Sequence, residues 1–261
     1  MSAKPLFVAG PCSLESPEVA LETAGGLKAL FSGRPGTRWV FKGSFLKDNR
    51  TSGSTHRGPG IAEGLSILGE VRRQFSVEVT TDIHEPSQAS RVAEVVDVIQ
   101  IPAFMCRQTS LLEAAGATGR TVNVKKGQFM NPSAMEGAVG KLRAAGCPEV
   151  WLTERGTFFG YGDLVVDFRS LGVMRGLADM VLLDVTHSLQ RPSSAGDRSG
   201  GCREHAVPLA RAAAAWGVDG LFFEVHPDPS SALSDPETTV DFDSASLLVD
   251  SALRHWEGSG R

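Results

Sequence analysis

Four residues that lie far apart in the sequence carry side chains able to bind a transition metal: Cys12, His187, Glu224 and Asp235. A thiolate together with an imidazole favours zinc or another borderline metal, and the carboxylates also admit iron or manganese. Because the four share no short spacing, the residue types leave a second interpretation open. In it, Cys12 is a small buried apolar residue and Asp235 caps a helix in "LSDPET". Separately, His187 could serve in proton transfer rather than in metal binding.

A second set of candidate residues is cationic and suits phosphate and carboxylate groups, since arginine offers a fork of donors and lysine a point charge. The set comprises Lys42, Lys47, Arg50, Arg57, Arg107, Lys125, Arg155 and Arg203. Single basic residues at strand ends are usually solvated or paired, but Lys42, Lys125 and Arg155 follow apolar, core-facing runs. The stretch "LKDNRTSGSTHRGPG" is either a disordered connector or a phosphate-gripping loop, and its basic residues beside hydroxyls favour the loop.

Short apolar runs alternate with longer Ala/Leu-rich stretches along the whole chain, and this alternation predicts the fold. The strand-like runs are "PLFVA", "RWVFKG", "VEVTTD", "VDVIQI", "TVNVKK", "EVWLTE", "MVLLDVTH" and "GLFFEVH". Eight β/α units in 261 residues predict an α/β fold, a single (β/α)8 TIM barrel domain over residues 1–261. A doubly wound sheet is the alternative, but no Gly-rich dinucleotide motif follows the first strand.

Each predicted strand ends in a residue with an ionisable, amide or thiol side chain. In chain order these are Cys12, Lys42, Asp82 with His84, Gln100, Lys125 with Lys126, Glu154 with Arg155, Asp184 with His187, and Glu224 with His226. Active sites of this fold lie at the carboxyl ends of the strands. The pattern therefore predicts a polar, ionisable pocket at one rim of the barrel.

The composition is that of an ordinary globular protein and excludes several function classes. The chain is 41% hydrophobic and 21% charged with a net charge of −4, so we expect no nucleic-acid partner. No apolar run is long enough to span a bilayer and no signal peptide is evident, so we expect no membrane partner and a cytoplasmic location. The four cysteines form no C-x-x-C pair and no disulfide framework.

Long blocks of the sequence carry a resemblance to a known family. They include "AGPCSLES", "FKGSFLKDNRTS", "IQIPAFMCRQTSLL", "VNVKKGQFMNP", "LTERGTFFGYGDLVVDFRSL", "DVTHSLQ" and "FFEVHPDPSSALSD". Together they cover nearly the whole chain, which closely resembles the 3-deoxy-D-manno-octulosonate 8-phosphate (KDO8P) synthases. The resemblance implies a homotetrameric enzyme that condenses phosphoenolpyruvate with D-arabinose 5-phosphate and water, giving KDO8P and phosphate. Members with a cysteine at the position of Cys12 are the metal-dependent type, so one divalent transition metal (Zn, Fe or Mn) is implied at Cys12, His187, Glu224 and Asp235.

The resemblance also implies roles in phosphoenolpyruvate binding. Lys125 and Arg155, with the backbone of Ala103, would hold the phosphate. Lys47, near Ser44, would hold the carboxylate.

Further roles concern the reacting carbons, the sugar phosphate and the walls of the pocket. Lys42 would lie beside the reacting carbons. Arg50 and Thr51 would grip the sugar phosphate, and Asn49 would contact the sugar hydroxyls. The remaining implied residues are Arg107, which would reach toward a neighbouring subunit's site, and Asp82, His84 and Gln100, which would line the pocket floor. The stretch "LQRPSSAGDRSGG" would close over the substrates.

The chain departs from the family in the loop that reads the sugar phosphate. The family commonly has "KANRSSIHSFRGPG", where this chain has "KDNRTSGSTHRGPG". These positions lie where the aldose phosphate would be read, so a variant synthase for another aldose phosphate is an alternative. The nearest rival is 3-deoxy-D-arabino-heptulosonate 7-phosphate synthase, which uses erythrose 4-phosphate but has proline at the position of Asn49. A catalytically silent barrel is the third alternative, and the intact cationic and metal-binding residues argue against it.

Overall fold

The structure of the chain is a computed structural model, and it describes residues 4–48, 57–159, 161, 163–195 and 198–258. Within these residues, eight parallel strands close into a barrel in the order β1-β10-β7-β6-β5-β4-β3-β2. Their bounds are β1 Leu6–Gly10, β2 Arg38–Lys42, β3 Glu78–Asp82, β4 Val98–Ile101, β5 Thr121–Lys125, β6 Val150–Glu154, β7 Met180–Asp184 and β10 Gly220–Glu224. The predicted barrel and its strands are thereby confirmed.

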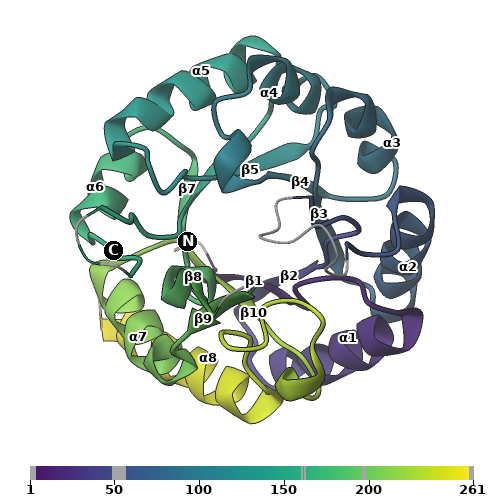
Figure 1. The fold of residues 1–261 in the computed structure, drawn as a ribbon, viewed down its shortest axis with the longest axis vertical. Coiled ribbons are helices and arrows are strands. Elements are labelled where there is room, and N and C mark those ends of the chain that lie inside the picture. Colours follow the sequence, from purple (N-terminus) through teal and green to yellow (C-terminus); the bar gives the residue numbers. More distant parts are fainter. Residues whose placement is uncertain (1–3, 49–56, 160, 162, 196–197, 259–261) are drawn as a thin grey trace.

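Helices surround the strands, as Figure 1 shows in a view along the barrel. They are α1 Pro17–Ser32, α2 Ile61–Phe75, α3 Ala89–Ala93, α4 Thr109–Gly116, α5 Glu136–Ala144, α6 Arg169–Arg175, α7 Ala206–Trp216 and α8 Phe242–Gly258. Ser16 caps α1 by accepting from the Val19 backbone at 3.2 Å, with Pro17 at the first helical position. None of the described helices combines the length and apolar character that crossing a membrane requires.

The core has two layers because strand side chains alternate between the barrel interior and the helices. The interior layer is small: Leu6, Val8, Val40, Val98, Trp151, Leu182 and Phe222. The much larger outer layer packs the other face of the strands against the helices and includes Phe7, Phe41 and Phe223. Residues on both faces are buried, which explains the nearly continuous apolar runs in the sequence.

An antiparallel hairpin of β8 (Gln190–Ala195) and β9 (Arg198–Gly201) lies outside the barrel order, between β7 and α7. The sequence of this segment, "LQRPSSAGDRSGG", predicts only a long loop. The residues just past the hairpin contact the loop after β10, since Arg203 donates through Nη2 to the Pro236 carbonyl oxygen at 2.8 Å. The segment that follows β7 is thus tied to the loop that carries Asp235.

Candidate active site and metal centre

The strand register brings the polar strand ends to one mouth of the barrel. On β2, Val40 belongs to the interior layer, so Lys42, two residues later, points into the barrel as well. Phe222 and Glu224 on β10 are related in the same way. The same spacing puts further buried polar side chains above the interior layer: Asp82, Gln100, Lys125, Arg155 and Asp184. An ionisable cluster at the carboxyl ends of the strands follows from this alternation.

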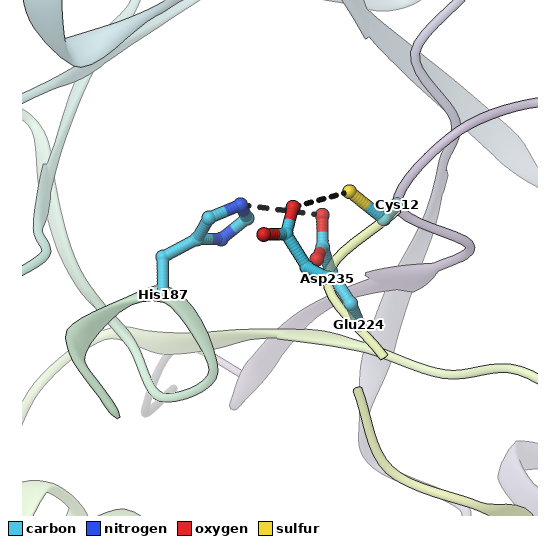
Figure 2. Close-up of side chains that lie close together, drawn as sticks. All are labelled: Cys12, His187, Glu224 and Asp235. Carbon is cyan, nitrogen blue, oxygen red and sulfur yellow. Dashed lines mark hydrogen bonds and ion pairs between the residues drawn. The ribbon is translucent and has the colours of Figure 1, made fainter. Parts of the chain in front are cut away.

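The four candidate metal ligands come together at this mouth. One ligand atom from each of Cys12, His187, Glu224 and Asp235 lies within 4.8 Å of the others. The Cys12 Sγ donates to Asp235 Oδ2 at 3.1 Å, and His187 Nε2 lies 3.5 Å from Glu224 Oε1. Figure 2 shows the four side chains pointing toward one another from separate segments of the chain. The barrel therefore supplies the proximity that the sequence spacing could not show.

The chemistry of these four residues fits a divalent transition metal. Glu224 Oε2 is buried and has no hydrogen-bond partner among the described residues, which leaves this oxygen available as a ligand. Burial raises the pKa of the Cys12 thiol well above its usual range, and the charge of Glu224 adds to this effect. A buried thiol of this kind ionises when a cation compensates its charge. Sulfur, nitrogen and two carboxylate oxygens form the donor set of a borderline metal.

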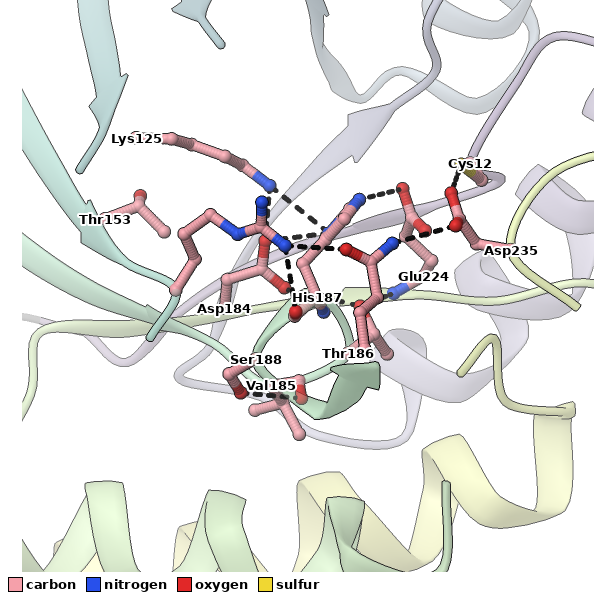
Figure 3. Close-up of polar contacts among 12 residues, drawn as sticks. Cys12, Lys125, Thr153, Asp184, Val185, Thr186, His187, Ser188, Glu224 and Asp235 are labelled. Carbon is pink, nitrogen blue, oxygen red and sulfur yellow. Dashed lines mark hydrogen bonds and ion pairs between the residues drawn. The ribbon is translucent and has the colours of Figure 1, made fainter. Parts of the chain in front are cut away.

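Asp184 orients His187 by contacting the ring nitrogen that does not face the ligand cluster. Its Oδ2 lies 2.8 Å from His187 Nδ1, and its Oδ1 accepts from the His187 backbone N–H at 2.9 Å. A carboxylate on one ring nitrogen fixes the imidazole so that the other nitrogen, here Nε2, faces the ligand cluster. Figure 3 shows this chain of contacts from Lys125 and Asp184 through His187 to Glu224. Burial opposes the charge on Asp184, but His187 and Lys125 outweigh it and hold the pKa of the carboxyl far below its usual range.

Lys42 links the metal-ligand cluster to the rest of the mouth. Its Nζ donates to Glu224 Oε1 at 2.8 Å and to the Cys12 carbonyl oxygen at 2.6 Å, and both side chains of the ion pair are buried. Burial works against the Glu224 carboxylate, but the charges of His187 and Lys42 outweigh it and lower its pKa to about 2. Glu224 is therefore ionised, as a ligand must be.

Lys125 and Arg155 form the cationic side of the mouth. Lys125 Nζ is paired with Asp184 and lies 3.4 Å above the ring of Phe222. Burial lowers the pKa of Lys125 to about 8, although Asp184 opposes the shift. Arg155 is buried and donates through Nη2 to the His187 carbonyl oxygen at 2.9 Å. Its Nε–H has no partner among the described residues, so a donor is left for an anion.

A third group lies around β3. Asp82 and His84 are buried, and His84 Nε2 lies 3.4 Å from Asp82 Oδ2. Burial opposes ionisation of Asp82, but the charges of Lys47, His84 and Lys42 lower its pKa to about 2. The hydroxyl of Ser13 and His84 Nδ1 are buried without partners among the described residues. Buried polar atoms of this kind need a partner, and a polar ligand would supply one.

The other predicted site residues are distributed as follows. Ser44 is fully buried and lies next to the mouth. It pairs with Ser13 in a short parallel bridge, and its carbonyl oxygen accepts from the Leu14 N–H at 2.9 Å. Gln100 is buried and accepts from Asn123 Nδ2 at 3.3 Å. Ala103 is buried at the start of a short 3-10 turn, whereas Arg107 is exposed.

Asn49, Arg50 and Thr51 lie outside the described residues. The two ends of that segment are adjacent, because the Lys47 N–H donates to the Arg57 carbonyl oxygen at 2.7 Å. Lys47 itself is half-buried.

Lys126 and Glu154 were predicted at the rim with their neighbours, but the two lie on the other face of the strands. Both are fully buried there, with Lys126 Nζ 3.3 Å from Glu154 Oε1. Glu154 also accepts from the N–H groups of Arg155 at 2.9 Å and Gly156 at 2.7 Å, and so shapes the turn that carries Arg155. The alternation of side chains along a strand would have revealed this, because Lys126 directly follows Lys125.

Two further contributors were not predicted as site residues. The sequence shows Asp184 at the end of a predicted strand. Its position three residues before His187 in "DVTH" could have indicated that its side chain contacts that histidine. Gln190 carried no signal of its own. It accepts from Arg155 Nη2 at 2.6 Å and donates to Asp235 Oδ1 at 2.8 Å.

Comparisons with known proteins agree on one family. The profile of the DAHP synthetase I family matches residues 2–252. A protein of Nitratidesulfovibrio vulgaris (strain DP4), named 2-dehydro-3-deoxyphosphooctonate aldolase, is 51% identical over 98% of this chain and 93% of its own length. A Synechococcus protein of the same name is 56% identical over 87% of this chain and 79% of its own length, and one from Stenotrophomonas maltophilia (strain K279a) is 49% identical over 96% and 91%. With a family match across nearly its whole length and relatives at about half identity, the chain belongs to the DAHP synthetase I family.

Proposed function

We propose that this chain is an enzyme that condenses phosphoenolpyruvate with D-arabinose 5-phosphate and water to give KDO8P and phosphate. The observation that carries the proposal is that the metal-ligand cluster and several buried cations share one mouth of the barrel. The two groups are joined there by an ion pair and a hydrogen bond. Lys42 is paired with Glu224, and Arg155 donates to the carbonyl oxygen of His187. The relatives' name, 2-dehydro-3-deoxyphosphooctonate aldolase, denotes this synthase activity and favours it over the heptulosonate synthase.

The cations suit the charge of the substrates. Two phosphates and a carboxylate would bring several negative charges to one mouth, and buried cations held in place by the fold would offset them with little reorganisation. Lys125 and Arg155 would hold the phosphate of phosphoenolpyruvate, and the Nε–H of Arg155, which finds no partner in the described part of the chain, supports that role. Lys47 and Ser44 would hold its carboxylate, with Ala103 contributing backbone.

The remaining residues would position the reaction. Carbon 3 of the enol must reach the sugar aldehyde, while water adds at carbon 2 and phosphate leaves, so the reaction depends on alignment of three components. Lys42, Asp82, His84 and Gln100 are buried side chains at or just past the strand ends, and they can hold this alignment. Asn49, Arg50 and Thr51 would bind the sugar phosphate. Arg107, exposed in the structure, would serve a neighbouring subunit.

One divalent transition metal, Zn, Fe or Mn, would be held by Cys12, His187, Glu224 and Asp235. A bound metal supplies polarisation and orientation of an aldehyde, or a water of lowered pKa. The chain's own part is to keep the ligands ionised and aimed: Asp184 fixes the ring of His187, and Lys42 offsets the charge of Glu224.

The test is phosphate release from phosphoenolpyruvate, run in parallel with arabinose 5-phosphate and erythrose 4-phosphate. Each reaction is repeated with a chelator and after adding back Zn²⁺, Mn²⁺ or Fe²⁺. We expect release with arabinose 5-phosphate that the chelator abolishes and metal restores. Arg155→Met should abolish release, whereas Arg72→Met on the exposed face of α2 should not. Release only with another aldose would assign the difference to the altered loop at residues 48–56, and no release with either sugar would support a silent barrel.

We further propose a single catalytic domain, a cytoplasmic location and a homotetramer. Large apolar side chains exposed on the loops after β4, β5 and β6 support self-association: Phe104, Phe129, Phe158, Phe159 and Tyr161. Sedimentation of the purified protein should give the mass of four chains, and a monomer would contradict this part of the proposal.

A further inference from the structure

The side-chain carboxamide of Gln190, the first residue of β8, connects the two halves of the site. Its Oε1 accepts from Arg155 Nη2 at 2.6 Å, and its Nε2 donates to Asp235 Oδ1 at 2.8 Å. Asp235 in turn accepts at its other oxygen, Oδ2, from Cys12 Sγ at 3.1 Å. A continuous path of polar contacts therefore runs from the buried cation to the metal-ligand cluster through one residue.

The partners of Gln190 explain why a carboxamide is needed there. A guanidinium can only donate hydrogen bonds, and a carboxylate can only accept them. The bridging side chain must present an acceptor toward Arg155 and a donor toward Asp235, and among side chains of this length a glutamine does both. The same requirement fixes the orientation of the amide, since the flipped amide would face donor with donor and acceptor with acceptor.

The backbone places Gln190 beside His187. The 3-10 turn His187–Leu189 has about three residues per turn, so residues three apart lie on the same side of it. The Gln190 N–H donates to the His187 carbonyl oxygen, the same oxygen that accepts from Arg155. One turn thus carries both a candidate metal ligand and the bridging amide.

The backbone of Asp235, which sets the direction of its side chain, adopts a left-handed conformation. Its φ is 51°, in the left-handed region that residues with a side chain adopt rarely. With Oδ1 taken by the amide, Oδ2 is the oxygen turned toward Cys12. An amide that holds one oxygen of a ligating carboxylate directs the other to the metal.

We propose that Gln190 is a positioning residue that aligns the anion-binding arginine and the metal-binding aspartate with each other, so that substrate phosphate and metal are held in one fixed geometry. This inference rests on the proposed function, because it takes Arg155 to bind phosphate and Asp235 to bind metal. It assigns to Gln190 no contact with the reacting atoms.

The test compares Gln190→Met, which keeps the length of the side chain and removes both hydrogen bonds, with the wild type. Zinc affinity is measured by competition with a chromophoric chelator in the absence of substrates. Phosphoenolpyruvate affinity is measured by calorimetry at zinc concentrations that saturate each protein. We expect zinc to bind about 10- to 100-fold more weakly. Phosphoenolpyruvate should bind about tenfold more weakly, equivalent to about 1.4 kcal/mol for one lost hydrogen bond to a charged group.

Two controls separate this role from damage to the fold. Gln74→Met, on an exposed position of α2, should change neither affinity. Gln190→Asn keeps the amide but is one methylene too short to span both partners, and it should reproduce the losses of Gln190→Met with an unchanged melting temperature. Loss of only one affinity, or of neither, would overturn the bridge while leaving the proposed function intact. A wild type that binds neither zinc nor phosphoenolpyruvate would overturn the proposed function and the bridge together.

Discussion

Asp184→Asn is the substitution that tests the buried electrostatics of the site most directly. The Asp184 carboxylate is fully buried and is the partner of both Lys125 and His187. An asparagine has nearly the same shape but no charge, and its NH₂ group cannot accept from Lys125 or His187. The change therefore removes one charge from a buried site and leaves the buried Lys125 without its carboxylate partner.

The size of the effect follows from that burial. Removing one partner of a buried ion pair costs about 3–5 kcal/mol. At about 2–4 °C per kcal/mol for a chain of this size, the melting temperature should fall by about 6–20 °C. Burial already lowers the pKa of Lys125 to about 8, and Asp184 is what opposes this shift. Without Asp184 the pKa of Lys125 falls further, so less of the lysine is charged at pH 7 and phosphoenolpyruvate should bind more weakly.

The assay combines calorimetric melting, zinc competition and the KM for phosphoenolpyruvate. Loss of the carboxylate behind His187 should weaken zinc about 10- to 100-fold. Asp167→Asn is the matched control, because Asp167 pairs with Arg169 on the exposed surface and should affect none of the three measurements. If Asp184→Asn retained both the zinc affinity and the KM of the wild type, Asp184 would neither orient His187 nor sustain the charge of Lys125.

Three further substitutions test separate parts of the structure. Cys12→Asn should reduce bound metal while the fold survives; metal retained at one equivalent per chain would remove Cys12 from the ligand set. Asp82 has a pKa of about 2 against an ordinary 3.8, so its contribution of about 2 kcal/mol is present above about pH 4 and is lost as the pH falls toward 2. Asp82→Asn should therefore flatten the acid limb of the unfolding curve between pH 4 and 2, and an unchanged limb would contradict the pairing. Gly10→Ala should prevent folding of the barrel, because the added Cβ would lie 2.0 Å from the Lys42 carbonyl oxygen, and a soluble, normally melting variant would refute this close approach.

The barrel could be predicted because each strand is buried on both faces and therefore appears in the sequence as a short apolar run. The β8–β9 hairpin could not, since "QRPSSA" and "RSGG" have no apolar alternation. Its strands pair with each other, and its base packs so closely on the loop after β10 that a Cβ on Gly201 would meet Thr238 at 2.2 Å. Contacts between segments so far apart in the chain leave no local trace in the sequence.

The residues of the site also fall into two classes, those that the strand pattern predicts and those that it does not. Residues that the strands aim directly, such as Lys42 and Glu224, follow from the fold and the two-residue period, and that period also separates Lys125 from Lys126. Gln190 is different, because its role depends on which hydrogen-bonding types face it from two other segments. A glutamine in a polar loop is unremarkable until a donor-only guanidinium and an acceptor-only carboxylate stand on either side of it. The first class of residue can be sought in a sequence once a barrel is predicted, whereas the second requires the three-dimensional arrangement of its partners.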